Sequence, residues 1–303
     1  MTDVSLTDLT VAEKLADGGQ GTVYRLADGR LLKLYHAEVA VLAAELGRLI
    51  QLPVRKLVGA TTAWPTGRVF HRGRCVGLLM PEAPGRFAAL LAGRARLLEL
   101  QFLLYPRRAM WASLALPDAE GRRRLAAGYA ALFDVLHRNE IVVGDVSMRN
   151  LLWTLAGGPS VYAIDCDGFR LVGRPPAVRP ADTAGWVDPA CPRAVTLDTD
   201  RYKLALLMVR LLLGNHTATP ADAKALPRVG FGPSVAALAA LAERPGARPP
   251  AAAWLAALSG DAAPGGSRIA TSSIRTCFPL PNSGGTGKAL PVVSAAAQDG
   301  IRR

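Results

Sequence analysis

The sequence predicts an α+β protein, with a β-sheet in its first part and helices in the rest. Between residues 11 and 81, short apolar runs alternate with turn residues, which is typical of strands. After residue 85, apolar residues recur every three or four positions, as they do on one face of a helix. We therefore expect a small N-terminal lobe (11–81) with one helix, a hinge (81–84) and a larger, mostly helical C-terminal lobe (85–258).

The first strands enclose a glycine-rich segment. A strand begins at Val11–Leu15, and a second strand follows with alternating apolar residues from Val23. Between them lie the glycines Gly18, Gly19 and Gly21. Glycines without a Cβ let backbone amides approach a polyphosphate closely, although an ordinary hairpin turn has a similar composition.

A lysine interrupts the next apolar strand. The Asp28–Gly29 pair predicts a tight hairpin that returns the chain into this strand, where Lys33 is either solvated or directed at a phosphate. The following residues 37–50 have the apolar spacing of a helix. Glu45 lies beside the apolar stripe and is the preferred partner of Lys33, and Glu38 is the competing candidate.

The rest of the chain changes from strands to helices. Two short strands, around Val69 and Phe70 and over Cys75–Met80, end at Pro81. The EAPGR and GRAR segments (82–86 and 93–96) then mark the change to helices. Helices are expected on the run up to His137 and over Tyr202–Leu213, 235–243 and 251–258. Residues 1–10 are expected to be an N-terminal extension, and the Gly-, Ser-, Ala- and Pro-rich stretch 259–303 a disordered tail.

Two short β-branched runs carry the chemistry. Ile141–Trp153 contains Asp145 and, five residues later, Asn150, while Val161–Phe169 contains Asp165. Phosphoryl transfer needs a carboxylate beside the acceptor hydroxyl and hard oxygen ligands for Mg²⁺. Asp145 would be the base, with Asn150 and Asp165 as metal ligands. The alternative is that all three are turn residues between strands.

The charge and the cysteine spacing argue against a nucleic-acid-binding protein, a zinc protein and a disulfide-rich protein. The formal net charge of +12 comes mainly from arginine, but no nucleic-acid-binding motif accompanies it and only 6% of residues are aromatic, so no nucleic-acid partner is expected. The four cysteines form no C-x-x-C pair, which argues against a zinc site or a disulfide framework.

The sequence also argues against targeting to a membrane. The first ten residues lack the features of a signal peptide. The longest apolar helical run, 204–213, is shorter than the roughly 20 residues that span a bilayer. We expect a cytoplasmic protein without a membrane span.

In the order of these parts, the chain resembles the protein kinase superfamily, in particular the bacterial eukaryotic-like Ser/Thr kinases, over residues 11–258. The resemblance implies a bilobal fold whose glycine-rich loop contains Gly18, Gly21 and Val23, with Lys33 gripping the nucleotide phosphates and Glu45 fixing that lysine. It further implies an adenine site bordered by Met80, Glu82 and Ala83 at the hinge. Asp145 then inherits the role of base, and Asn150 and Asp165 bind Mg²⁺ or Mn²⁺.

The resemblance assigns three more positions. Thr183 matches the threonine near the end of the activation segment, Asp200 the aspartate that opens a buried central helix, and Arg248 a late structural arginine. Arg149 could supply the charge that many of these kinases place on a lysine two residues earlier, where this chain has Ser147.

Several motifs depart from the family pattern. VGD replaces His-Arg-Asp, and DCD replaces Asp-Phe-Gly, so that Asp167 either adds a carboxylate to the metal site or faces solvent. Ala190 stands where a glutamate would pair with Arg248, so that pair is absent or moved to Asp188. Control by loop phosphorylation is accordingly not expected.

The resemblance implies ATP- and Mg²⁺-dependent transfer of the γ-phosphoryl group to Ser or Thr of a protein substrate. Two alternatives remain open. A pseudokinase would keep the fold as a nucleotide-binding scaffold, and a small-molecule phosphotransferase of the aminoglycoside-kinase type shares the G-D-x-x-x-x-N and I-D-x-D patterns.

Overall fold

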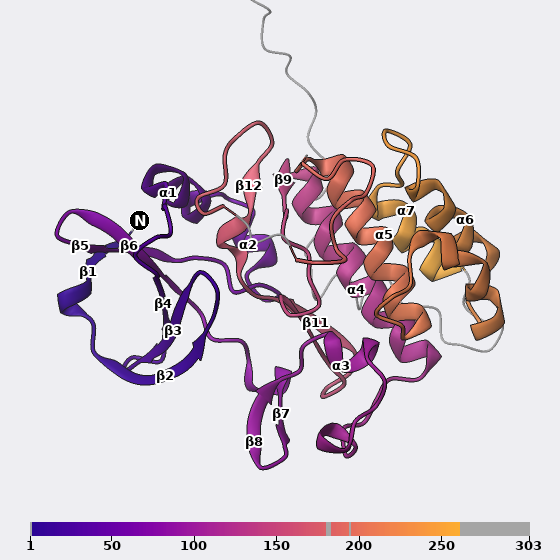
Figure 1. Cartoon of the computed structure of the whole chain (residues 1–303), viewed down its shortest axis with the longest axis horizontal. Coiled ribbons are helices and arrows are strands. Elements are labelled where there is room, and N and C mark those ends of the chain that lie inside the picture. Colours follow the sequence, from indigo (N-terminus) through magenta and orange to yellow (C-terminus); the bar gives the residue numbers. More distant parts are fainter. Residues whose placement is uncertain (1, 180–182, 194, 261–303) are drawn as a thin grey trace, which may run out of the picture.

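The computed structural model describes residues 2–179, 183–193 and 195–260, and these residues form an α+β structure. Figure 1 shows a sheet at the N-terminal end of the molecule and a group of helices at the other end. The sheet has six strands in the order β1-β5-β6-β4-β3-β2. Their bounds are Thr2–Ser5 (β1), Val11–Asp17 (β2), Gly21–Leu26 (β3), Leu31–Tyr35 (β4), Gly67–His71 (β5) and Arg74–Met80 (β6).

Lys33 lies on β4, which runs antiparallel between β3 and β6. Its sheet partners are Val23 on β3 and Leu78 on β6. The predicted hairpin turn joins β3 to β4, and Gly29 at this turn has a φ of 83° that favours glycine. The strands expected around Lys33, Val69 and Cys75–Met80 are therefore confirmed.

Residues 2–8 of the expected N-terminal extension form a strand and a 3-10 turn at the edge of the sheet. β1 pairs in parallel with β5, with Val4 opposite Val69, and a 3-10 helix, η1 (Leu6–Asp8), follows it. Val4, Leu6 and Leu9 pack against the apolar cluster that contains Val69. This pairing joins segments more than 60 residues apart, which no local pattern indicates.

The helix expected over residues 37–50 is confirmed only in its second part, because α1 runs over Ala43–Gln51. Residues 41 and 42 contact a later segment instead: Val41 forms a β-bridge with Val178, and the Leu42 amide donates to the Ala177 carbonyl at 2.8 Å. α1 buries Leu46, Leu49 and Ile50, and a short helix, α2 (Arg55–Val58), follows.

The change from strands to helices comes later than predicted. After a 3-10 turn, η2 (Gly85–Phe87), the chain forms a hairpin of β7 (Ala88–Leu91) and β8 (Arg94–Leu97) that extends from the body in Figure 1. The GRAR segment lies in its turn and second strand, and Gly93 has a φ of 77°. Leu90 on this hairpin is 71% exposed, so burial does not impose a clear pattern on it. Two short turns, α3 (Gln101–Leu104) and η3 (Ala109–Trp111), lead to the long helices.

Four longer helices form the C-terminal part: α4 (Ala119–Arg138), α5 (Leu197–Leu213), α6 (Pro233–Ala242) and α7 (Ala251–Gly260), with the 3-10 segment η5 (Pro220–Val229) between α5 and α6. They confirm the four predicted helices, although α5 begins five residues before Tyr202, where Thr196 caps it by a capping box. α7 includes residues 259 and 260 of the predicted tail, and 261–303 lie outside the described residues.

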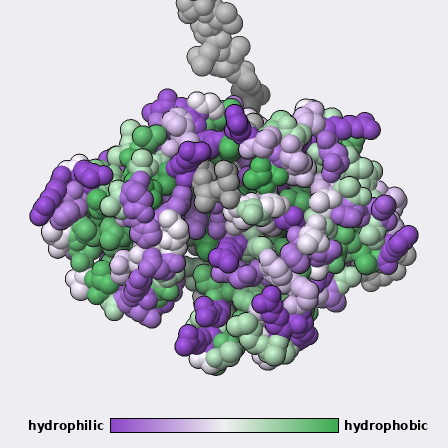
Figure 2. Space-filling view, viewed as in Figure 1, coloured by the Kyte–Doolittle hydropathy of each residue, from purple (hydrophilic) through white to green (hydrophobic). Residues whose placement is uncertain are grey.

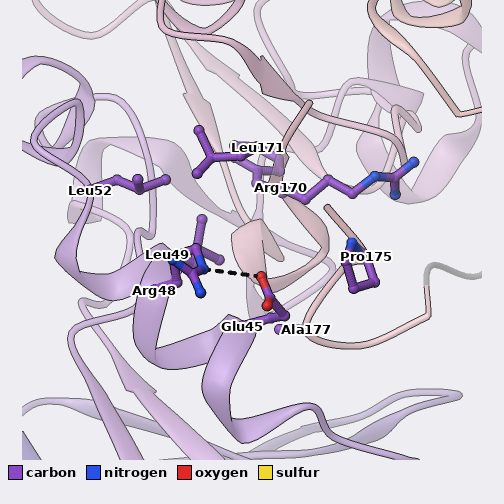
Figure 3. A pocket seen from close by; sticks show the side chains of 9 residues that line it. Glu45, Arg48, Leu49, Leu52, Arg170, Leu171, Pro175 and Ala177 are labelled. Carbon is purple, nitrogen blue, oxygen red and sulfur yellow. Dashed lines mark ion pairs between the residues drawn. The ribbon is translucent and has the colours of Figure 1, made fainter. Parts of the chain in front are cut away.

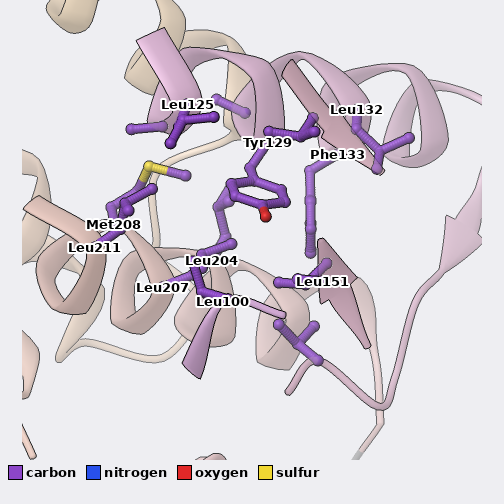
Figure 4. Close-up of a cluster of buried hydrophobic side chains, with 14 of the residues drawn as sticks. Leu100, Leu125, Tyr129, Leu132, Phe133, Leu151, Leu204, Leu207, Met208 and Leu211 are labelled. Atoms are coloured by element: carbon purple, nitrogen blue, oxygen red, sulfur yellow. The ribbon is translucent and has the colours of Figure 1, made fainter. Parts of the chain in front are cut away.

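The main core lies between α4 and α5. In Figure 4, Tyr129 and Phe133 of α4 face Leu204 and Leu207 of α5, and Leu151 closes one side. These side chains are all less than 4% exposed. The surface in Figure 2 mixes hydrophilic and hydrophobic residues. Among the described residues, none of the helices has the length and hydrophobicity needed to cross a membrane.

Candidate functional site

A short hairpin brings Asn150 and Asp165 to the same place. β10 (Leu151–Thr154) pairs with β11 (Ser160–Ala163), with Leu151 opposite Ala163, and the Ile164 amide donates to the Asn150 carbonyl at 2.9 Å. Asn150 precedes the first strand and Asp165 follows the second, so both lie at the open end of the hairpin. Asp165 has a φ of 55°, an uncommon conformation for aspartate outside turns.

Asp145 lies beside Asn150. The Asn150 Nδ2 atom donates to the Asp145 carboxylate and to its carbonyl, each at 3.2 Å, and the Thr183 hydroxyl donates to Asp145 Oδ1 at 3.1 Å. Burial raises the pKa of Asp145, and the hydrogen bond from Thr183 and the charge of Lys203 offset part of that rise. The Asp165 charge also contributes to the rise, which places the two carboxylates in one electrostatic neighbourhood.

The loop that carries Asp145 is attached to the central helix α5. Asp200, which is fully buried in its first turn, accepts hydrogen bonds from the backbone amides of Val143 and Gly144 at 2.6 and 3.0 Å. Lys203, one turn later, donates to the Gly144 carbonyl at 2.5 Å. β9 (Ile141–Val142), paired with β12 (Arg170–Leu171), delivers the chain to this point. Asp200 thus lies in the first turn of a buried helix, which begins at Leu197 and not at Asp200, and it positions the loop.

Lys33 reaches the same region from the sheet. Its Nζ atom lies 3.2 Å from Asp165 Oδ1 and 3.0 and 3.1 Å from the two oxygens of Asp167, and the residue is only 5% exposed. Burial alone would lower the pKa of Lys33, but the charges of Asp167 and Asp165 outweigh it and hold the pKa above its ordinary value. Lys33 is therefore a buried cation held by two carboxylates.

The predicted pairing of Glu45 with Lys33 is wrong, and Glu38 does not replace it. Glu45 pairs with Arg174, whose Nε lies 3.4 Å from Oε2, and with Arg48 at 3.4 Å. Figure 3 shows Glu45 and Arg48 on one wall of a small pocket whose other walls come from residues 169–177. Because α1 begins only at Ala43, Glu45 lies in its first turn and faces this later segment. The Glu38 side chain is 78% exposed.

Asp167 and Tyr35 both contact the Lys33 region in a way that the sequence did not predict. Asp167, expected at a metal or in solvent, has a side chain that is only 4% exposed, and Cys166 beside it is also buried. The Tyr35 hydroxyl donates to Asp167 Oδ2 at 2.7 Å. Tyr35 was not predicted as a site residue at all, although its place two residues after Lys33 on a strand puts both side chains on one face of the sheet. Asp165 directly precedes the 3-10 turn η4 (Cys166–Gly168), which contains Cys166 and Asp167.

The glycine-rich segment is the turn between β2 and β3. The Gly18 amide donates to the Gly21 carbonyl at 3.0 Å, and a Cβ at Gly19 would meet open space. A Cβ at Gly21 would lie 2.4 Å from the Leu34 carbonyl oxygen, so packing of β3 against β4 by itself requires glycine there. Gly21 is thus explained without a ligand, whereas the sheet does not require Gly19.

Two of the three residues predicted to border an adenine, Met80 and Ala83, contribute to one apolar cluster, and Glu82 does not. Met80, 6% exposed, belongs to one apolar cluster, and Val23 and Ala83 pack against it. The Glu82 side chain lies apart from this cluster and pairs with Arg25, at 2.6 and 3.0 Å. β3 and the segment at the end of β6 thus contribute to one apolar cluster next to the Lys33 strand.

Arg149 and Arg248 have partners outside this centre. Arg149 is exposed, and its charge acts on Glu99, whose pKa burial raises. Arg248 is fully buried and forms a two-pronged ion pair with Asp188, at 2.6 and 3.0 Å, which is one of the two outcomes expected from the loss of the glutamate.

The donor set suits a Mg²⁺ ion that a nucleotide helps to bind. Within residues 2–179, 183–193 and 195–260, no group of three or more His, Cys, Asp or Glu side chains is arranged to hold a metal by itself. Asp165 is 41% exposed, and the amide nitrogen of Asn150 faces Asp145, which leaves its oxygen as a second hard ligand. Magnesium sites of nucleotide enzymes commonly use one or two such ligands together with phosphate oxygens.

Comparison with known proteins adds no assignment. No protein-family model matches the chain, and no curated protein matches it either. The function must therefore be argued from the site itself.

Proposed function

We propose that this chain is a phosphotransferase with a two-lobed, protein-kinase-like fold, which uses ATP and Mg²⁺ to phosphorylate Ser or Thr of a protein substrate. The observation that carries the proposal is the convergence of a buried lysine, two aspartates and an asparagine from three separate segments. Lys33 comes from the sheet, Asp145 and Asn150 from the loop after β9, and Asp165 from the end of β11.

Each group has a task in this reaction. Lys33 would offer its ammonium group to nucleotide phosphates, and the partly buried Val23 and Ala83, which pack against the cluster of Met80, would border a flat base. Asp165 and Asn150 would hold Mg²⁺, which neutralises phosphate charge when bound. Asp145 accepts a hydrogen bond from the Thr183 hydroxyl, so its carboxylate has the surroundings of a group that orients an acceptor hydroxyl.

One observation favours a second candidate. Glu45 is committed to Arg174 rather than to Lys33, as would suit a scaffold that binds a nucleotide without transferring its phosphate. The presence of Lys33, Asp145, Asn150 and Asp165 in one site favours the enzyme over this pseudokinase.

The test is transfer of labelled γ-phosphate from ATP, with Mg²⁺ or Mn²⁺, to the protein itself and to generic protein acceptors. We expect label on Ser or Thr in the wild type and none in Asp145→Ala or Asp165→Ala. Asp8→Ala, an exposed aspartate in η1, is the matched control and should label normally. Full turnover in Asp165→Ala would refute the metal assignment.

The alternatives give different results in the same assay. Nucleotide binding without label would favour the pseudokinase. Transfer to an aminoglycoside or another small hydroxyl compound, but not to protein, would favour the small-molecule phosphotransferase.

A further inference from the structure

Lys33 and Tyr35 of β4 form a buried unit with Asp167. Both residues project from the same face of β4, and the Lys33 ammonium lies 5.7 Å from the centre of the Tyr35 ring. Asp167 accepts from Tyr35 at 2.7 Å and contacts Lys33 through both of its oxygens, at 3.0 and 3.1 Å. All three residues are at most 7% exposed.

The two carboxylates that hold Lys33 are not equivalent. The Asp165 side chain is 41% exposed and touches Lys33 through one oxygen, at 3.2 Å, whereas the Asp167 side chain is 4% exposed and touches it through both. A buried carboxylate must keep its partners, because an unpaired charge in the interior is costly. Asp167 is therefore a lasting contact, and Asp165 is the carboxylate that remains accessible to another ligand.

We propose that Asp167, fixed by Tyr35, positions Lys33 for the nucleotide phosphates and so performs the task that the sequence suggested for Glu45. The proposal rests on the proposed function, since it gives Lys33 phosphates to bind. The two aspartates of the DCD motif then have different roles: Asp165 would bind the metal, and Asp167 would hold Lys33. Asp167 and Tyr35 are positioning residues that act through Lys33 and do not touch the substrate.

The first experiment measures the lysine itself and needs no nucleotide. The full chain is treated with formaldehyde and a mild borohydride, and methylation of Lys33 is followed by mass spectrometry relative to the exposed Lys14. In Asp167→Asn, which preserves the shape but removes the charge, Lys33 methylation should rise severalfold. Tyr35→Phe should give a smaller rise, and it also serves as the milder variant if Asp167→Asn does not fold.

The second experiment measures transfer in a double-mutant cycle. We expect Asp167→Asn to lower kcat/KM by about 10- to 100-fold, the usual range for a group that orients a ligand-binding residue. In a Lys33→Met background, the same substitution should cause little further loss, because the lysine it positions is gone. Asp28→Asn, at the exposed turn before β4, should retain wild-type activity.

The outcomes distinguish failure of the positioning role of Asp167 from failure of the proposed phosphotransferase function. Additive losses in the cycle, or unchanged Lys33 methylation in Asp167→Asn, would overturn the positioning role, as would a larger effect of Glu45→Gln on both readouts. If the wild type neither binds nor uses ATP, the proposed function fails. Methylation would then still show whether Asp167 holds Lys33.

Discussion

Replacing Asp188 by alanine would leave the Arg248 guanidinium in the core without its main partner. The two side chains are 0% and 1% exposed and are joined by two hydrogen bonds. Arg248 would retain the Ala242 carbonyl at 3.1 Å and the Asp198 carboxylate, also at 3.1 Å. The substitution therefore leaves a buried positive charge that Asp198 compensates only in part.

The expected cost follows from that geometry. Removing one member of a buried ion pair costs about 3–5 kcal/mol, and the remaining contact with Asp198 favours the lower end. For a domain of this size, about 3 kcal/mol lowers the melting temperature by roughly 6–12 °C. A paired replacement, Asp188→Leu with Arg248→Met, removes both charges and should cost less than Asp188→Ala alone.

Denaturant unfolding followed by circular dichroism measures these differences. The matched control is Asp28→Ala, because Asp28 and Arg30 form a solvent-exposed pair whose loss should change the stability little. If Asp188→Ala remained within about 1 kcal/mol of the wild type, the reasoning from burial would be wrong.

Two further predictions concern the glycine-rich turn and the pH dependence of transfer. Gly21→Ala should destabilise the fold by about 1–3 kcal/mol, because its Cβ would lie 2.4 Å from the Leu34 carbonyl oxygen. Gly19→Ala, whose Cβ would meet open space, should be nearly neutral in the same unfolding assay. Equal effects of the two substitutions would contradict this reasoning. The hydrogen bond from Thr183 lowers the pKa of Asp145 against the effect of burial. Thr183→Val should therefore raise this pKa and move the acid limb of the kcat/KM profile to higher pH, and an unmoved limb would count against Asp145 as the base.

The sequence was most informative where structure is set by local patterns. The apolar stripes of α4 and α5 predicted both helices, since each helix must bury one face or nearly all of its surface. The pattern of Asp145, Asn150 and Asp165 predicted one shared site, and the β10–β11 pair explains how Asn150 and Asp165 come to lie at the same end.

The misses arise from contacts between distant segments. The pairing of β1 with β5 depends on a strand that has little pattern of its own. The partner of Glu45 depends on where α1 begins, and that start is determined by contacts of residues 41 and 42 with residues 177 and 178. Asp167 was foreseen as a carboxylate, but its burial against Tyr35 required knowledge of how η4 packs below β4.

The attachment of the Asp145 loop to α5 has a consequence for the timing of its motions. The amide protons of Val143 and Gly144 are held by a carboxylate that is itself inside the core, so they exchange with solvent only when the start of α5 opens. The loop is thereby part of the same cooperative unit as the central helix. Its slowest hydrogen exchange should follow that of α5, whereas the exposed β7–β8 hairpin exchanges on its own, faster timescale.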